Sequence, residues 1–182
     1  MNIFATRPFS RVVLRFTSFA ALISVLVPFV VAQAGQSVTL TKIYVDEKSG
    51  RIHIVDSSMK DLEIPPEKDQ VDTAQPKIAD DHRTAGWLIE SKIDDGTSYP
   101  IPLCLIIYRD AKIIRRFPTD MTIGDWRFVD GAKQVALYTD TLHGSLAPHY
   151  ELRDVSTGRL IAKFDGHLGP GSPAWTRGFS EN

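Results

Sequence analysis

Apolar and polar residues alternate along most of the chain after the first 36 residues, and this period of two is typical of β-strands. In "RIHIV", for example, Ile52 and Ile54 fall on one face, and Arg51 and His53 fall on the other. Val, Ile, Tyr, Phe and Thr, which suit a pleated surface, dominate these runs. The alternation predicts strands over residues 37–45, 51–55, 84–91, 103–108, 112–117, 133–140, 149–154 and 159–164.

Turn residues separate these runs. "DEKSG" and "VSTG" predict tight turns, the second with Gly158 available for a positive φ. Residues 64–77, "IPPEKDQVDTAQPK", hold three prolines and several charges and predict a loop between two sheet units. Residues 93–102 and 141–149 predict long hairpin loops at matching places in successive units. Many short strands with regular turns predict an all-β sandwich, barrel or propeller.

An internal repeat favours the propeller. Residues 79–91 can be set over residues 129–141 without gaps, and an Arg-Asp pair precedes a turn later in each copy. The apolar positions then coincide as Ala85 with Val135, Trp87 with Leu137, and Ile89 with Thr139. The offset of about 50 residues is close to the period of propeller blades. We expect antiparallel blade-like sheets that form a partial or small β-propeller, with a β-sandwich as the alternative.

The first 34 residues have the pattern of a secretory signal peptide. Three arginines precede an apolar run over residues 16–32, and Ala32-Gln33-Ala34 is a small-x-small cleavage pattern. The run is shorter than the roughly 20 residues of a spanning helix and contains Pro28, which weighs against the alternative of an uncleaved anchor. We expect cleavage after Ala34, a periplasmic or secreted protein, and one all-β domain over residues 35–182.

Charge and cysteine content limit the partners. Loss of the leader removes three arginines and leaves 18 basic residues against 22 acidic ones, a formal charge of −4. A mildly acidic chain without basic runs argues against nucleic acid and against an anionic membrane surface as partners. After cleavage, no apolar run is long enough to predict stable insertion into a membrane. The single Cys104 cannot form a disulfide within the chain.

Two segments resemble the WD-type β-propeller repeats of periplasmic, Tol-system-like proteins. In "WRFVDGAKQVALYTD", Trp126, Asp130 and Gly131 match the aromatic residue and the Asp-Gly turn, although Trp126 lies one residue too far from that turn. In "SPAWTRGF", Pro173 and Trp175 match the lead-in that opens a repeat. The resemblance spans about three degenerate units and implies an exported scaffold; such repeats share no catalytic residues.

The lead-in at Pro173 opens a unit that few residues remain to complete. We expect this half-unit to act as an assembly strand that pairs with residues 37–45, within the chain or across a dimer, because pairing would protect the terminal edge strands. Three units are fewer than the 4–8 blades of ordinary propellers. Two chains could therefore complete one ring, or the sheets could form an open stack.

The two long loops are the expected binding face, because equivalent loops line one rim and function gathers on loops. The residues that we expect to contact a partner are Asp94, Asp95, Tyr99, His143 and His149. No catalytic residue and no cofactor are predicted. A metal site can be drawn from His143, His149 and His167, but their spacing is not diagnostic, so no metal is predicted either. Cys104 lies in an apolar run without an adjacent base and is predicted to be a core residue.

These features together predict a non-catalytic binding or assembly module of the cell envelope or the extracellular space. Its partner would be another protein or a second copy of the chain, as in a homodimer. The alternative is a small secreted hydrolase or carbohydrate-binding domain that uses the loop histidines and aspartates. A third interpretation, a propeller remnant without its own function, predicts a poorly soluble mature chain.

Overall fold

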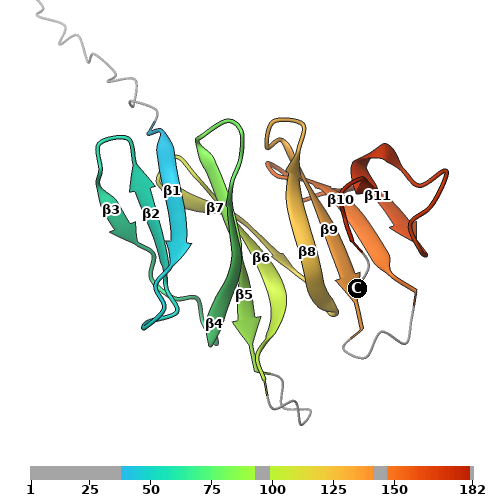
Figure 1. Cartoon of the computed structure of the whole chain (residues 1–182), viewed down its shortest axis with the longest axis horizontal. Coiled ribbons are helices and arrows are strands. Elements are labelled where there is room, and N and C mark those ends of the chain that lie inside the picture. Colours follow the sequence, from blue (N-terminus) through green and yellow to red (C-terminus); the bar gives the residue numbers. More distant parts are fainter. Residues whose placement is uncertain (1–37, 93–98, 142–146, 181–182) are drawn as a thin grey trace, which may run out of the picture. The chain divides into compact units, whose positions relative to one another are not determined.

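The described part of the chain folds into three antiparallel sheets, which follow one another in sequence (Figure 1). The computed structural model describes residues 38–92, 99–141 and 147–180, all within one compact unit, Gly35–Asn182. The first sheet contains β1 (Leu40–Val45), β2 (Ile52–Asp56) and β3 (Asp61–Glu63). The middle sheet contains β4 (Asp72–Ile78), β5 (Thr84–Ser91), β6 (Ile101–Arg109) and β7 (Lys112–Pro118). The last sheet contains β8 (Thr122–Val129), β9 (Gln134–Asp140), β10 (His149–Asp154) and β11 (Leu160–Asp165).

Each sheet is a meander in which strands pair with their neighbours in sequence. The middle and last sheets share the same four-strand order, as the repeat predicts, and the first sheet is a three-strand version. The prediction of an all-β fold with antiparallel blade-like sheets is therefore confirmed. Within the ranges given above, the structure has no helix with the length and apolarity that a membrane span requires.

The middle sheet is buried on both faces, which explains the nearly continuous apolar runs of β5 and β6. Side chains alternate between the two faces along each strand. Trp87, Ile106 and Tyr108 pack against the first sheet, where they meet Ile52 and Ile54. The opposite face of the middle sheet packs against the last sheet through a second apolar cluster, which includes Leu88, Leu105, Ile107, Phe117, Ile123, Trp126, Val135 and Leu137.

Trp126 lies between the middle and last sheets. Its side chain is fully buried, and its indole nitrogen donates to the carbonyl oxygen of Gln75 at 3.2 Å. The Gln75 side-chain nitrogen in turn donates to the Gly124 carbonyl at 2.8 Å. Lys77 Nζ lies 2.7 Å from Asp125 Oδ1 and 5.0 Å from the Trp126 ring centroid. Side chains of β4 therefore link the middle sheet to β8.

The prediction of a loop over residues 64–77 is wrong for its second half. Residues Asp72–Ile78 form β4, which pairs with β5. The pairing register shifts between Ala74 and Lys77, where Gln75 has a φ of 49° and Pro76 follows. A bulge allows a proline inside a strand because the bulged residues leave the hydrogen-bonded ladder.

Two hairpins close with the same six-residue turn, at residues 46–51 and 154–159. In each, an aspartate accepts hydrogen bonds from the turn: Asp46 from Ser49, and Asp154 from Ser156 and Thr157. In the second turn, Gly158 has a positive φ, and its backbone nitrogen donates to the Asp154 carbonyl oxygen at 2.8 Å. Hydrogen bonds from the side chains and backbone nitrogens of Ser156 and Thr157 lower the pKa of Asp154 to about 2.

The segment after β11 does not form the expected assembly strand. Pro173 precedes a single 3-10 turn, Ala174–Thr176, and the structure assigns no strand between residues 166 and 180. Trp175 and Phe179 pack on the outer face of the last sheet instead. The expectation that this segment pairs with residues 37–45 is therefore wrong for a single chain.

We predict that Gly86→Ala destabilises the stack of sheets. A Cβ atom at Gly86 would lie 2.7 Å from a Trp126 ring carbon and 2.8 Å from the Ile106 carbonyl oxygen, and the backbone oxygen cannot move aside easily. Overpacking of this kind costs about 1–3 kcal/mol of unfolding free energy. Urea unfolding measures the loss. The control is Gly169→Ala, where the new Cβ meets nothing within 4 Å. Equal unfolding midpoints for the two variants would show that the space around Gly86 accepts a methyl group.

Candidate functional site

The connection between β7 and β8 brings the bases of the two long loops together. The Thr119 backbone nitrogen donates to the Leu103 carbonyl at 2.8 Å, which ties the connection to the beginning of β6. The same connection faces Thr139 at the end of β9 and His149 at the beginning of β10 across a pocket. The described ends of both loops therefore meet at one rim.

Strand β10 supplies one wall of this pocket. His149, Glu151 and Arg153 alternate along the strand and so share a face. Their ladder partners on β9 are Thr139, Leu137 and Val135, and the last two pack toward the middle sheet. The row of polar side chains therefore lies on the side of the last sheet that faces the middle sheet.

The three side chains form a chain of ion pairs. Glu151 is central: Oε2 accepts from Arg153 Nε at 2.5 Å, and Oε1 lies 3.4 Å from His149 Nε2. The other ring nitrogen of His149 contacts Asp165 on β11. The Glu151 side chain is only 17% exposed. Burial raises its pKa, but the hydrogen bonds and charges of Arg153 and His149 outweigh burial, so the pKa lies below its ordinary value.

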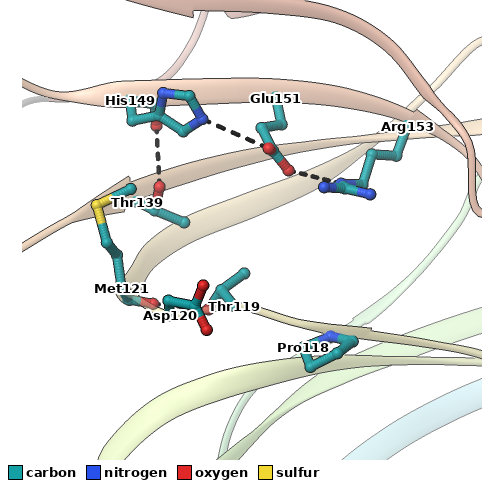
Figure 2. Close-up of a pocket in the computed structure, with 8 residues that line it drawn as sticks. All are labelled: Pro118, Thr119, Asp120, Met121, Thr139, His149, Glu151 and Arg153. Atoms are coloured by element: carbon teal, nitrogen blue, oxygen red, sulfur yellow. Dashed lines mark hydrogen bonds and ion pairs between the residues drawn. The ribbon is translucent and has the colours of Figure 1, made fainter.

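Figure 2 shows this row above the β7–β8 connection. The pocket between them has a volume of about 180 Å³ and is lined by Pro118, Thr119, Asp120, Met121, Thr139, His149, Glu151 and Arg153. This volume is below the roughly 300–1,000 Å³ of pockets that enclose a drug-sized ligand. It suits one side chain or another small polar group.

The histidine, glutamate and threonine side chains of the pocket are held in fixed contacts. Both nitrogens of His149 face carboxylates, and Glu151 is engaged on both oxygens. The Thr139 hydroxyl donates to the His149 carbonyl at 3.3 Å, and the Thr119 hydroxyl donates to the Met121 carbonyl at 2.6 Å. These contacts hold the charged side chains of the pocket in fixed positions, as recognition of a partner requires.

Of the predicted binding residues, the structure brings His149 into the pocket. Tyr99 is 52% exposed and does not line it. Asp94, Asp95 and His143 lie outside the described residues. His149 lies at the end of the second long loop, and its contact with a partner stays a prediction, like those of the other four residues.

Two other candidate sites from the sequence are the histidine metal site and Cys104, and their described residues have ordinary structural surroundings. His149 meets Asp165, but His167 is exposed, and the described part of the chain has no cluster of three or more His, Cys, Asp or Glu residues arranged to hold a metal ion. Cys104 is half-buried in β6, and burial raises the pKa of its thiol to about 11. A thiol of this kind stays protonated at neutral pH.

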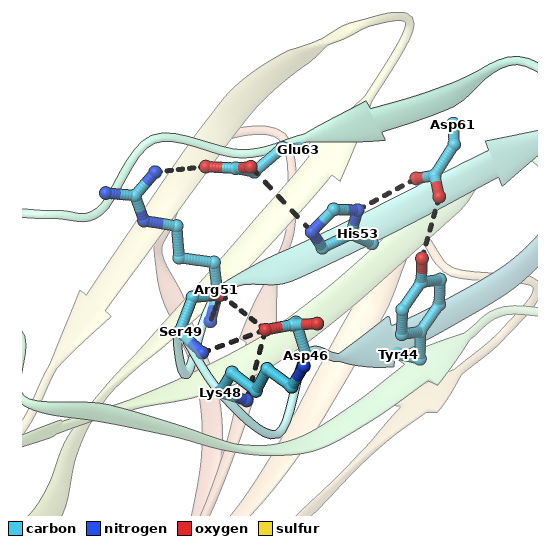
Figure 3. Close-up of polar contacts among 8 residues, drawn as sticks. All are labelled: Tyr44, Asp46, Lys48, Ser49, Arg51, His53, Asp61 and Glu63. Atoms are coloured by element: carbon cyan, nitrogen blue, oxygen red, sulfur yellow. Dashed lines mark hydrogen bonds and ion pairs between the residues drawn. The ribbon is translucent and has the colours of Figure 1, made fainter.

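A second polar cluster covers the outer face of the first sheet (Figure 3). Asp61 accepts from the Tyr44 hydroxyl at 2.7 Å, and its other oxygen lies 3.0 Å from His53 Nδ1. The Tyr44 and His53 rings stack with centroids 5.0 Å apart, and Arg51 pairs with Glu63. The side chains of Arg51, Asp61 and Glu63 are 44–45% exposed, so their contacts make this face polar and add little stability.

Sequence reasoning missed Glu151, Arg153 and Asp120. The signal for the first two was present, because "HYELR" places three ionisable residues at alternate positions of a predicted strand. Asp120 reaches the pocket only through the packing of the last sheet on the middle sheet, and no sequence pattern shows this.

Comparison of the sequence with the models of known protein families gives no match, and comparison with curated proteins gives none either.

We predict that Glu151→Gln lowers the unfolding free energy by about 1–3 kcal/mol at neutral pH, the usual cost of weakening hydrogen bonds to a charged partner. The folded-state pKa of Glu151 lies below its ordinary value of 4.5, so its stabilising effect is full above that value and is lost as the pH falls through the folded pKa. The difference from wild type should shrink below pH 4.5.

Urea titrations at several pH values measure this difference. The matched control is Glu63→Gln in the exposed pair with Arg51, which should cost less than about 1 kcal/mol. A Glu151→Gln effect that does not change with pH would show that the ion-pair chain does not stabilise the fold.

Proposed function

We propose that this chain is an exported, non-catalytic binding module of the cell envelope or the extracellular space, and that it contacts a protein partner at the rim around the His149–Glu151–Arg153 pocket. The observation that carries the proposal is the convergence of both loop bases on the β7–β8 connection, next to a half-buried row of fixed charges. A rigid scaffold that presents loops and ordered charges at one edge is a common design for recognition.

Three features favour recognition over turnover. A general acid needs a carboxyl group that is protonated near working pH, whereas the pKa of Glu151 is lowered. A general base needs a free imidazole nitrogen, whereas both nitrogens of His149 face carboxylates. The two hydroxyls at the pocket, from Thr119 and Thr139, donate to backbone carbonyls. These contacts suit a site that binds a partner without changing it.

We further propose that the sheets are degenerate propeller-type repeats. The identical meander order of the middle and last sheets supports this, together with the equivalent burial of Trp87 and Leu137, each facing the preceding sheet. The partner would be a protein or a second copy of the chain. An acidic formal charge after removal of the leader disfavours nucleic acid.

Export is tested by intact mass. We expect the protein recovered from the periplasm or the medium to begin at Gly35, because Ala32-Gln33-Ala34 is the cleavage pattern. Ala34→Leu should block cleavage and leave the protein attached to the membrane. A wild-type protein that keeps its first 34 residues would refute the proposed localisation.

Partner binding is tested by site-specific photocrosslinking in cells. A photoreactive residue at Met121, which lines the pocket, should give discrete crosslinked products with a protein partner. The matched control is Met59, which is 80% exposed in the β2–β3 turn of the first sheet. Arg153→Ala should abolish the products formed at position 121, since it removes one of the fixed charges. Equal products at both positions, or products that survive Arg153→Ala, would contradict a contact at this rim.

A further inference from the structure

The outer face of the last sheet carries a third apolar cluster. Ala136, Tyr138, Tyr150 and Leu152 project from β9 and β10 on this side, and all are buried. The first two apolar clusters are each closed by a neighbouring sheet. This one is closed by residues 167–179, which we call the covering segment.

The covering segment forms no strand; its one regular element is the 3-10 turn Ala174–Thr176. Its apolar side chains cover the outer face of the last sheet. The Phe179 ring lies 5.6 Å from the Tyr150 ring and 6.3 Å from the Tyr138 ring, measured between centroids, while Leu168 and Trp175 pack at the margin. The contact with the sheet is therefore made largely by a few side chains.

Arg127 of β8 is half-buried beneath the segment, at an energetic cost. It donates to the Trp175 carbonyl at 2.5 Å, and its guanidinium group lies 5.0 Å from the Phe179 ring centroid. Its Nε atom is buried without a hydrogen-bond partner in the structure, and burial lowers its pKa. A buried N–H group without an acceptor destabilises the closed state. Displacing the segment would return this group to water.

We propose that the covering segment is a removable cover, and that the face beneath it is an interaction surface for the same face of a second copy of this chain. An antiparallel sheet with an apolar face must pack it against something, and here the alternative to the segment is another sheet. The proposal concerns a surface other than the pocket rim and stands independently of it.

The second copy is the partner that the observed surfaces favour. The outer face of the first sheet carries Arg51, His53, Asp61 and Glu63, so it cannot match an apolar aromatic face. The uncovered face of the last sheet is complementary to itself, because aromatic rings pack well on aromatic and aliphatic side chains. Contact between identical faces about a two-fold axis forms a closed dimer.

The test compares the whole exported protein with Phe179→Ala by light scattering during size-exclusion chromatography. Wild type should have the mass of one chain. The mass of the variant should rise from that of one chain toward twice that value as the protein concentration increases, because the cover has lost its central contact. The matched control is Gly169→Ala within the covering segment, where the new Cβ meets nothing within 4 Å, and it should stay monomeric.

Acrylamide quenching of tryptophan fluorescence reports the state of the cover. Trp87 and Trp126 are fully buried, so Trp175 should account for any increase in quenching. Phe179→Ala should raise the quenching at low protein concentration, where the monomer prevails. Adding Leu152→Glu to Phe179→Ala should restore the mass of one chain, since it places a charge in the proposed interface.

Each of the remaining outcomes overturns the proposal. A displaced cover in a variant that stays monomeric at high concentration would show that the face does not pair with itself. A dimer that survives Leu152→Glu, or a wild-type dimer with Trp175 protected, would place the contact elsewhere. If Phe179→Ala fails to fold, Trp175→Ala weakens the margin of the cover instead. Unfolding of both variants would show that the segment is part of the core and cannot be removed.

Discussion

A sheet of three or four strands is stable only when its apolar face is covered, and the middle sheet of this chain has two apolar faces to cover. Trp87 and Ile106 point one way, while Leu88 and Leu105 point the other, and all four are buried. The first and last sheets supply the two covers. Because neither face of the middle sheet can be left in water, the order of the three sheets follows from the hydrophobic effect.

The same constraint explains where the polar chemistry lies. Residues on the packed faces must be apolar near the middle of each sheet, so ionisable side chains can occupy these faces only toward strand ends and sheet margins. Glu151 is such a case: it shares a face with Leu137 across the β9–β10 ladder, yet it lies at the pocket beside the β7–β8 connection. There it keeps its charge through Arg153 and His149. The pocket is a consequence of two twisted sheets meeting at a rim where apolar packing ends.

Much of this arrangement follows from local sequence, and some of it does not. The strands β5, β6, β9 and β10 are predictable because alternation and β-branched residues agree. Strand β4 is missed because Pro76 contradicts a strand unless Gln75 forms a bulge, and a bulge depends on the partner strand. The covering segment is misread because a proline-aromatic lead-in is local, whereas its 3-10 turn depends on the sheet below it.

The candidate site also combines a residue that the sequence predicts with residues that it does not. His149 is predictable from its place at the end of a long loop. Its partners are not, because Asp165 meets His149 only through the β10–β11 register, which pairs these two residues directly. Asp120 enters the pocket through packing between sheets. A one-residue slip of β11 would move Asp165 to the other face, since side chains alternate. Register therefore decides the chemistry of the site.

Strand β8 connects the parts of the fold that carry unsatisfied polar groups. The Trp126 indole donates to the Gln75 carbonyl, and the Gly124 carbonyl accepts from the Gln75 side-chain nitrogen. The Gln75 Oε1 atom is buried without a partner in the structure. Arg127 of β8 projects to the opposite face and has a buried Nε in the same condition. A buried polar atom without a partner costs free energy, so the positioning depends on the hydrogen bonds that β8 does make. Trp126 and Gly124 hold the last sheet on the middle sheet through Gln75, whereas the unpaired Nε of Arg127 weakens the contact of the covering segment with the last sheet. A shift of β8 would therefore change the packing on both faces of the last sheet.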